Sequence, residues 1–131
     1  MKKLIFIGLS LILGLQFAHA QSYDINRTEK NKGYAQQLKQ PYIDWAIQTM
    51  EDANKMLSLT EEQKDEVVYI NLMYAKRMEI LADKGTSPEN LKQHKTDMVT
   101  MAVNDYSRVL NESQQAILND KKAAFIEHSA E

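Results

Sequence analysis

Leu59-Thr60-Glu61-Glu62-Gln63 opens a long amphipathic segment, and Leu110-Asn111-Glu112-Ser113-Gln114 opens another one further along the chain. In the first segment, the Thr60 hydroxyl can accept a hydrogen bond from the backbone N–H of Gln63, while the Gln63 side chain accepts one from the N–H of Thr60. This reciprocal pair is a capping box, which satisfies N–H groups that the first turn of a helix leaves without partners. Asn111 and Gln114 can form the same arrangement, because Asn is among the best helix N-caps. The two stretches therefore predict two helix starts.

Apolar residues recur at helical spacing on both sides of these starts. Gly85 is typical of a helix end, and Ser87 followed by Pro88 is typical of a new helix start. The pattern predicts helices from near Pro41 to Leu57, from Thr60 to about Lys84, from Pro88 to about Val109, and from Asn111 onward. No stretch alternates apolar and polar residues for long enough to predict a strand. We therefore expect an all-α fold in which four helices pair as two kinked hairpins.

The first twenty residues have the pattern of a secretory signal peptide. Lys2 and Lys3 precede an apolar run, and Ala18-His19-Ala20 supplies the small residues that a signal peptidase requires. The apolar run is short for a transmembrane anchor, which needs about 20 residues. We expect residues 1–20 to be removed before Gln21 and the protein to be exported without a stable membrane anchor.

The rest of the chain is predicted to be one small domain behind a polar segment. Residues 21–38 are rich in charged and amide side chains and predict a flexible polar arm, and residues 39–131 predict the helical domain. The chain has 16 basic and 18 acidic side chains, so its net charge of −2 does not favour nucleic-acid binding. It has no Cys, which excludes disulfides and thiolate-bound zinc.

The sequence predicts neither an enzyme nor a metal or cofactor site. It contains no recognisable nucleophile motif and no glycine-rich phosphate loop. His94 and His128 fall on different predicted helices, and His94 is in phase with apolar residues, which favours packing over metal binding. A binding function is therefore the more economical hypothesis.

One helix face carries both apolar and basic side chains and could bind a partner. It consists of Tyr69, Met73, Lys76, Arg77 and Ile80. An ordinary solvated face and a dimer contact are the alternatives. Methionine side chains adapt to partners of variable shape. We expect Met50, Met78, Met98 and Met101 to lie in the core and Met73 to be an exposed apolar contact.

The paired capping motifs resemble those of the Spy/CpxP family of periplasmic helical proteins. Leu59, Thr60 and Gln63 fit the family's LTxxQ motif, whereas the second copy, with Leu110 and Gln114, has Asn111 in place of Thr. The resemblance covers residues 40 to 128 through motif spacing and helix layout. It implies an antiparallel, cradle-shaped homodimer in the periplasm.

The resemblance also implies a function that needs no ATP and no cofactor. The first hypothesis is a chaperone or envelope-stress accessory protein that binds partly unfolded envelope proteins. The alternative is a specific regulatory module that docks on one envelope sensor or another exported partner.

Overall fold

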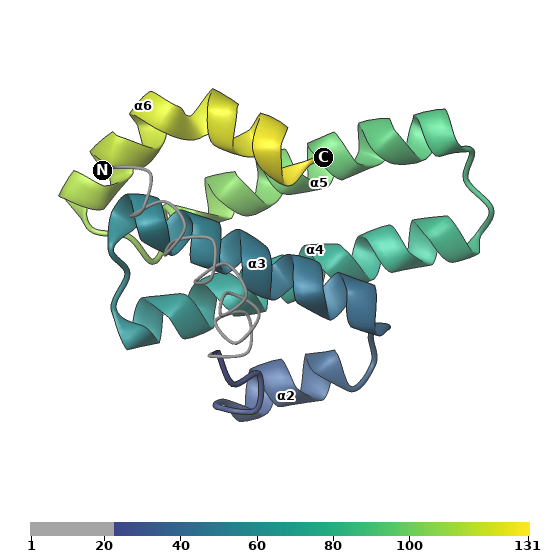
Figure 1. Ribbon diagram of the computed structural model, residues 1–131, viewed down its shortest axis with the longest axis horizontal. Helices are drawn as coiled ribbons and strands as arrows, with labels where there is room; N and C mark the ends of the chain where they lie inside the picture. The colour runs from purple at the N-terminus through teal and green to yellow at the C-terminus, as the bar shows by residue number, and fades with distance from the viewer. Residues whose placement is uncertain (1–22) are drawn as a thin grey trace, which may run out of the picture.

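A computed structural model describes residues 23–131, which form five α-helices and no strand (Figure 1). The all-α prediction is confirmed. The predicted signal peptide lies outside the described residues. None of the described helices is both long enough and apolar enough to span a membrane. The helices are α2 (Glu29–Ala35), α3 (Gln40–Leu57), α4 (Glu61–Asp83), α5 (Pro88–Tyr106) and α6 (Glu112–Ser129).

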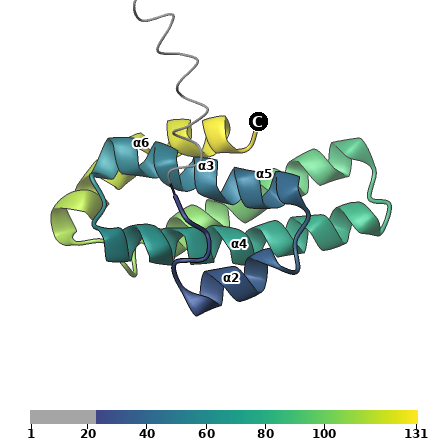
Figure 2. The same ribbon diagram turned by 60° about the horizontal axis from the view of Figure 1, so that its bottom comes forward.

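The longest helix, α4, is the centre of the fold. It packs along α3 on one side and α5 on another, while α6 folds back to contact α3 and α5 (Figures 1 and 2). The links are short, with residues 58–60 between α3 and α4 and residues 107–111 between α5 and α6. Ser58 makes the first of these turns possible by adopting the left-handed conformation, with a φ of 54°.

The core lies where α3, α4 and α5 meet. Ala46, Met50, Val67, Leu72 and Tyr106 are completely or almost completely buried there. A buried polar pair also crosses this core. Asn71 on α4 donates from Nδ2 to the carbonyl of Ala46 at 2.9 Å and accepts a hydrogen bond from the Tyr106 hydroxyl. Since buried polar groups need partners, these bonds fix the register of three helices.

The prediction of which residues of α5 are buried is wrong in part. Met101 was expected in the core but is 38% exposed, and Met98 is only partly buried. The buried face is instead Val99, Ala102, Val103 and Tyr106, which has the spacing i, i+3, i+4, i+7 of a helix stripe. Two apolar stripes lie side by side on this helix, and the one with the compact valines packs against α4.

The segment expected to be a flexible polar arm is instead folded against the domain in the part that the structure describes. Residues 23–38 include a helix, α2, and bury Tyr23, Asn31 and Leu38. Figure 2 shows α2 lying against α4. The part of the chain that the structure describes therefore has five helices where four were predicted. The segment was missed because polar contacts, which leave no hydrophobic pattern in the sequence, hold much of it in place.

Candidate functional site

Both predicted capping boxes are confirmed. Thr60 Oγ1 accepts from the N–H of Gln63 at 3.1 Å, and Gln63 Oε1 accepts from the N–H of Thr60 at 3.0 Å. At the start of α6 the same two bonds join Asn111 and Gln114, at 2.8 and 3.0 Å. The second motif therefore caps its helix although Asn replaces Thr.

The structure brings the two motifs together, although they are 51 residues apart in the chain. Gln63 Nε2 donates to Gln114 Oε1 at 2.7 Å, and Gln114 Nε2 donates to Gln63 Oε1 at 3.0 Å. The remaining amide hydrogens cross over, so that each glutamine also donates to the chain just before the other motif. Gln63 donates to the carbonyl of Val109 at 2.9 Å, and Gln114 donates to the carbonyl of Leu57 at 3.2 Å.

This reciprocal amide pair is a structural junction. Each carboxamide has two donor hydrogens and two acceptor lone pairs, and all of them are used. The pair links the start of α4 to the segment before α6, and the start of α6 to the end of α3. It has no free group to offer a ligand, so the capping motifs position the helices and leave the contact with any partner to other surfaces.

The predicted face of Tyr69, Met73, Lys76, Arg77 and Ile80 lies on α4 and is called the α4 strip below. Other parts of the chain cover some of it. The Tyr69 ring packs edge-on against Tyr34 with centroids 5.6 Å apart, and the ammonium of Lys30 lies 4.2 Å from its centroid. Lys76 Nζ donates to the carbonyl of Gln37 at 2.9 Å and pairs with Glu79 at 3.0 Å. Residues 30–37 therefore already occupy two members of the strip.

The other members of the strip are more accessible. Ile80 is 43% exposed, and Arg77 is exposed with its guanidinium 4.8 Å from the Tyr74 ring centroid. Met73, expected to be exposed, is half-buried. The strip is thus a partly covered surface on the outer face of α4.

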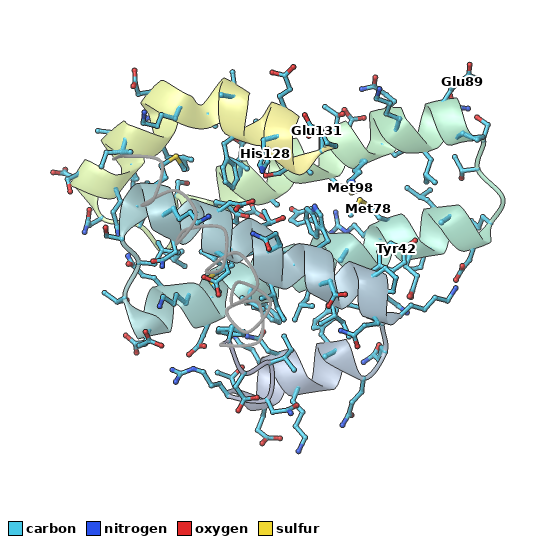
Figure 3. All side chains as sticks on the ribbon, viewed as in Figure 1. Tyr42, Met78, Glu89, Met98, His128 and Glu131 are labelled. Atoms are coloured by element: carbon cyan, nitrogen blue, oxygen red, sulfur yellow. The ribbon has the colours of Figure 1, made fainter. Side chains whose placement is uncertain are left out.

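A groove of about 710 Å³ that the sequence did not reveal lies between the helices. It forms where α3 begins and α6 ends, next to the outer half of the α4–α5 hairpin. Figure 3 shows Met78 and Met98 between α4 and α5, with Glu131 at the end of α6. The groove is called the Trp45 groove below, and its lining residues are Pro41, Tyr42, Trp45, Met78, Pro88, Leu91, Lys92, Lys95, Ala130 and Glu131.

The walls of the Trp45 groove are held in place by contacts between distant segments. Trp45 donates from Nε1 to the carbonyl of Ser129 at 3.0 Å, which joins α3 to the end of α6. Lys95 is half-buried, and burial lowers its pKa below the ordinary value. Among residues 23–131, no carboxylate lies within 4.0 Å of the ammonium of Lys92 or Lys95. The groove therefore combines an apolar wall with two cations that have no ion-pair partner there.

The described residues contain no cluster of three metal-binding side chains. His128 is exposed and lies 3.4 Å from Asp52, while His94 is half-buried on another helix. Neither of these two histidines therefore belongs to such a cluster. No protein-family model, curated protein or solved structure matches this chain.

Proposed function

We propose that this protein is a non-enzymatic, ATP-independent chaperone that binds apolar segments of partly unfolded polypeptides in the Trp45 groove. The observation that carries the proposal is the groove itself, whose volume of about 710 Å³ is in the range of known ligand sites. Tyr42, Trp45 and Leu91 offer large apolar contacts, and Met78 adds an adaptable one.

The resemblance of the capping motifs to the Spy/CpxP family supports the same proposal. It adds the periplasm as the location and partly unfolded envelope proteins as the clients. An open groove formed by helix ends suits extended segments of variable sequence, because side chains can enter it without passing through a narrow mouth.

The natural fluorescence of the protein tests the proposal. Trp45 is the chain's single Trp, so a client that enters the groove should shift the Trp emission. Tyr42→Ser and Leu91→Ser should weaken both this shift and the suppression of aggregation of several unrelated unfolding proteins without ATP. Ala123→Ser is the control, because Ala123 is exposed on α6 and lies outside both the groove and the surface proposed below for a dimer. If the unsubstituted protein suppresses no aggregation, the proposal that it is a chaperone is refuted.

A dedicated binding module is the second candidate, and the hydrogen bond that holds Trp45 against Ser129 favours it, because a wall fixed in one shape suits a single partner. Such a module would dock on one exported partner, for example an envelope sensor. Saturable binding of a single partner, without protection of unrelated unfolding proteins, would support this candidate over the chaperone.

We also propose that the protein forms a homodimer. Met101 and Ile117, which lie outside the α4 strip, are large apolar side chains that remain substantially exposed in the single chain. A small helical domain gains stability when such surface is buried against a second copy. Sedimentation at micromolar concentration should report twice the mass of one chain, and a stable monomer would contradict the dimer.

A further inference from the structure

Residues 23–39, called the α2 strap below, cross the outer face of α4 and are anchored at their start by Asp65. The Arg27 guanidinium donates to both Asp65 carboxylate oxygens at 3.0 Å, and the Tyr23 hydroxyl donates to Oδ1 at 2.8 Å. Asn31 Nδ2 adds a bond to the Asp65 carbonyl at 3.1 Å. One residue of α4 therefore receives three side chains of the strap.

The far end of the strap is anchored by the second half of α4. Lys76 Nζ donates to the Gln37 carbonyl at 2.9 Å, and Glu79 Oε2 accepts from the backbone N–H of Lys39 at 2.9 Å. Lys39 Nζ also pairs with Asp83 at 3.0 Å. Both ends of the strap are thus attached by hydrogen bonds and ion pairs.

The strap buries Tyr23 and Leu38, but its helix and its exposed ion pairs add little stability. Its helix has seven residues, too few to persist alone in water. Several of its ion pairs are exposed and contribute little. Asn31 is completely buried, yet its Oδ1 has no hydrogen-bond partner among the described residues, which is a further cost. A segment of this kind opens locally at a lower free energy than the core.

The strap covers members of the α4 strip in the way that a bound polypeptide would. Tyr34 places an aromatic ring against Tyr69, and Gln37 gives a backbone carbonyl to Lys76. Every extended polypeptide carries carbonyls, and aromatic side chains are common in segments exposed by unfolding. Met73, Arg77 and the exposed Ile80 complete this face of α4, in the stretch between the strap's anchor points at Asp65 and Asp83.

We infer that the α2 strap is a detachable internal occupant of the α4 strip, which it yields to an extended polypeptide segment that carries an aromatic side chain. The strip is then a second client surface, separate from the Trp45 groove and partly covered in the free protein. This inference rests on the proposed function, since it requires a polypeptide client.

Amide hydrogen exchange tests whether the strap detaches without any client. The N–H groups of residues 31–38 should exchange faster than those of the buried part of α4, residues 67–75, under native conditions. Equal protection of the two segments would overturn the inference, because the strap would then open only when the whole domain unfolds.

A cross-link tests whether detachment matters for binding. The chain has no Cys, so Lys30→Cys with Glu66→Cys creates one reactive pair where the native side chains are 3.7 Å apart and both exposed. A short bis-maleimide then locks the strap on α4. Gln93→Cys with Asp97→Cys, an exposed pair within α5, is the matched control for the reagent.

The locked strap should reduce the capacity to hold unfolding proteins relative to the same variant before cross-linking, while the linked control keeps its capacity. Equal capacity of the locked and unlocked proteins would overturn the inference and leave the proposed function intact. If the unlocked variant and the parent both hold nothing, the proposed function fails and the inference fails with it.

Discussion

At the scale of single residues, the amide pair of Gln63 and Gln114 makes a prediction about coupled stability. Gln63→Ala should cost about 1–3 kcal/mol of unfolding free energy, because it leaves the buried Gln114 carboxamide without two of its partners. Gln114→Ala should act similarly, and the double variant should cost less than the sum of the two, since the partners are removed together. Urea unfolding of the four proteins measures this coupling.

The control for this cycle is Gln93→Ala, whose side chain makes one exposed bond to Asp97 and should change the unfolding free energy by no more than about 0.5 kcal/mol. Strictly additive costs at Gln63 and Gln114 would show that the two carboxamides do not depend on each other.

Ser58 supplies a second prediction at this scale. It is the one non-glycine residue with a positive φ in the part of the chain that the structure describes. A left-handed conformation costs a residue with a Cβ atom about 1–2 kcal/mol, and glycine avoids that cost. Ser58→Gly should therefore raise the thermal midpoint, whereas Ser58→Val should lower it. The same change at Ser107, a helix end with an ordinary φ of −58°, should bring no gain.

The local bonds of both capping boxes could be predicted from sequence, because each involves residues three positions apart. The bond between the two glutamines could not. It depends on how α3, α4, α5 and α6 pack, and no pattern within either motif specifies its partner 51 residues away. Sequence showed that the motifs begin helices, and only the packing shows that they meet.

At the scale of elements, the α2 strap should loosen in acid. The pKa of Glu79 lies below its ordinary value, because the N–H of Lys39 and the ammonium of Lys76 donate to the carboxylate. Burial alone would raise the pKa of Asp65, but hydrogen bonds from Arg27 and Tyr23 outweigh it and leave this pKa lowered too. A lowered folded-state pKa gives stability that is present above the unfolded value, about 4, and is lost as the pH falls through the folded value.

Exchange of residues 31–38, corrected for the intrinsic effect of pH, should therefore speed up as the pH falls below about 4. Glu79→Gln should weaken this dependence, because its amide carries no charge to lose. Asp97→Asn, on the exposed face of α5, should leave the dependence unchanged. A strap equally protected on both sides of this pH range would contradict the role given to the two carboxylates.

Two elements show where hydrophobic patterning succeeds and fails. The bounds of α3 and α4 were predicted closely, since strong apolar stripes and clear end signals define them. The strap was missed because Arg27, Asn31 and Lys39 attach it by hydrogen bonds that no periodicity records. On α5 two stripes of similar strength competed, and the choice between them is made by the surface of α4.

At the scale of the whole molecule, the Trp45 groove could not be predicted, because four separate parts of the chain line it. Trp45 was the one signal available, since Trp is enriched at contact surfaces. The α4 strip was predicted from the sequence, but the α2 strap that covers part of it was not. The strip is a property of one helix, whereas the groove exists only because α6 ends beside the start of α3 and leaves the outer half of the α4–α5 hairpin uncovered on that side (Figure 1).

The charges of the groove lead to a prediction about the rate of client capture. Lys92 is exposed on the groove wall, and Glu131 is the carboxylate that offsets it there. Lys92→Glu should slow the capture of acidic unfolding proteins at low salt, and the effect should fade as salt rises, because screening removes the attraction between exposed charges. Stopped-flow measurement of Trp45 emission reports the rate directly.

Lys121→Glu is the control for this charge reversal. It changes the net charge of the protein by the same amount but lies on an exposed face of α6 outside the groove. If both variants slow capture equally, acidic clients respond to the charge of the whole molecule. If only Lys92→Glu slows it, the client passes this wall of the Trp45 groove as it binds. Unchanged rates in both variants would mean that apolar contact alone governs the rate of capture. Lys92 and Lys121 would then have no part in it.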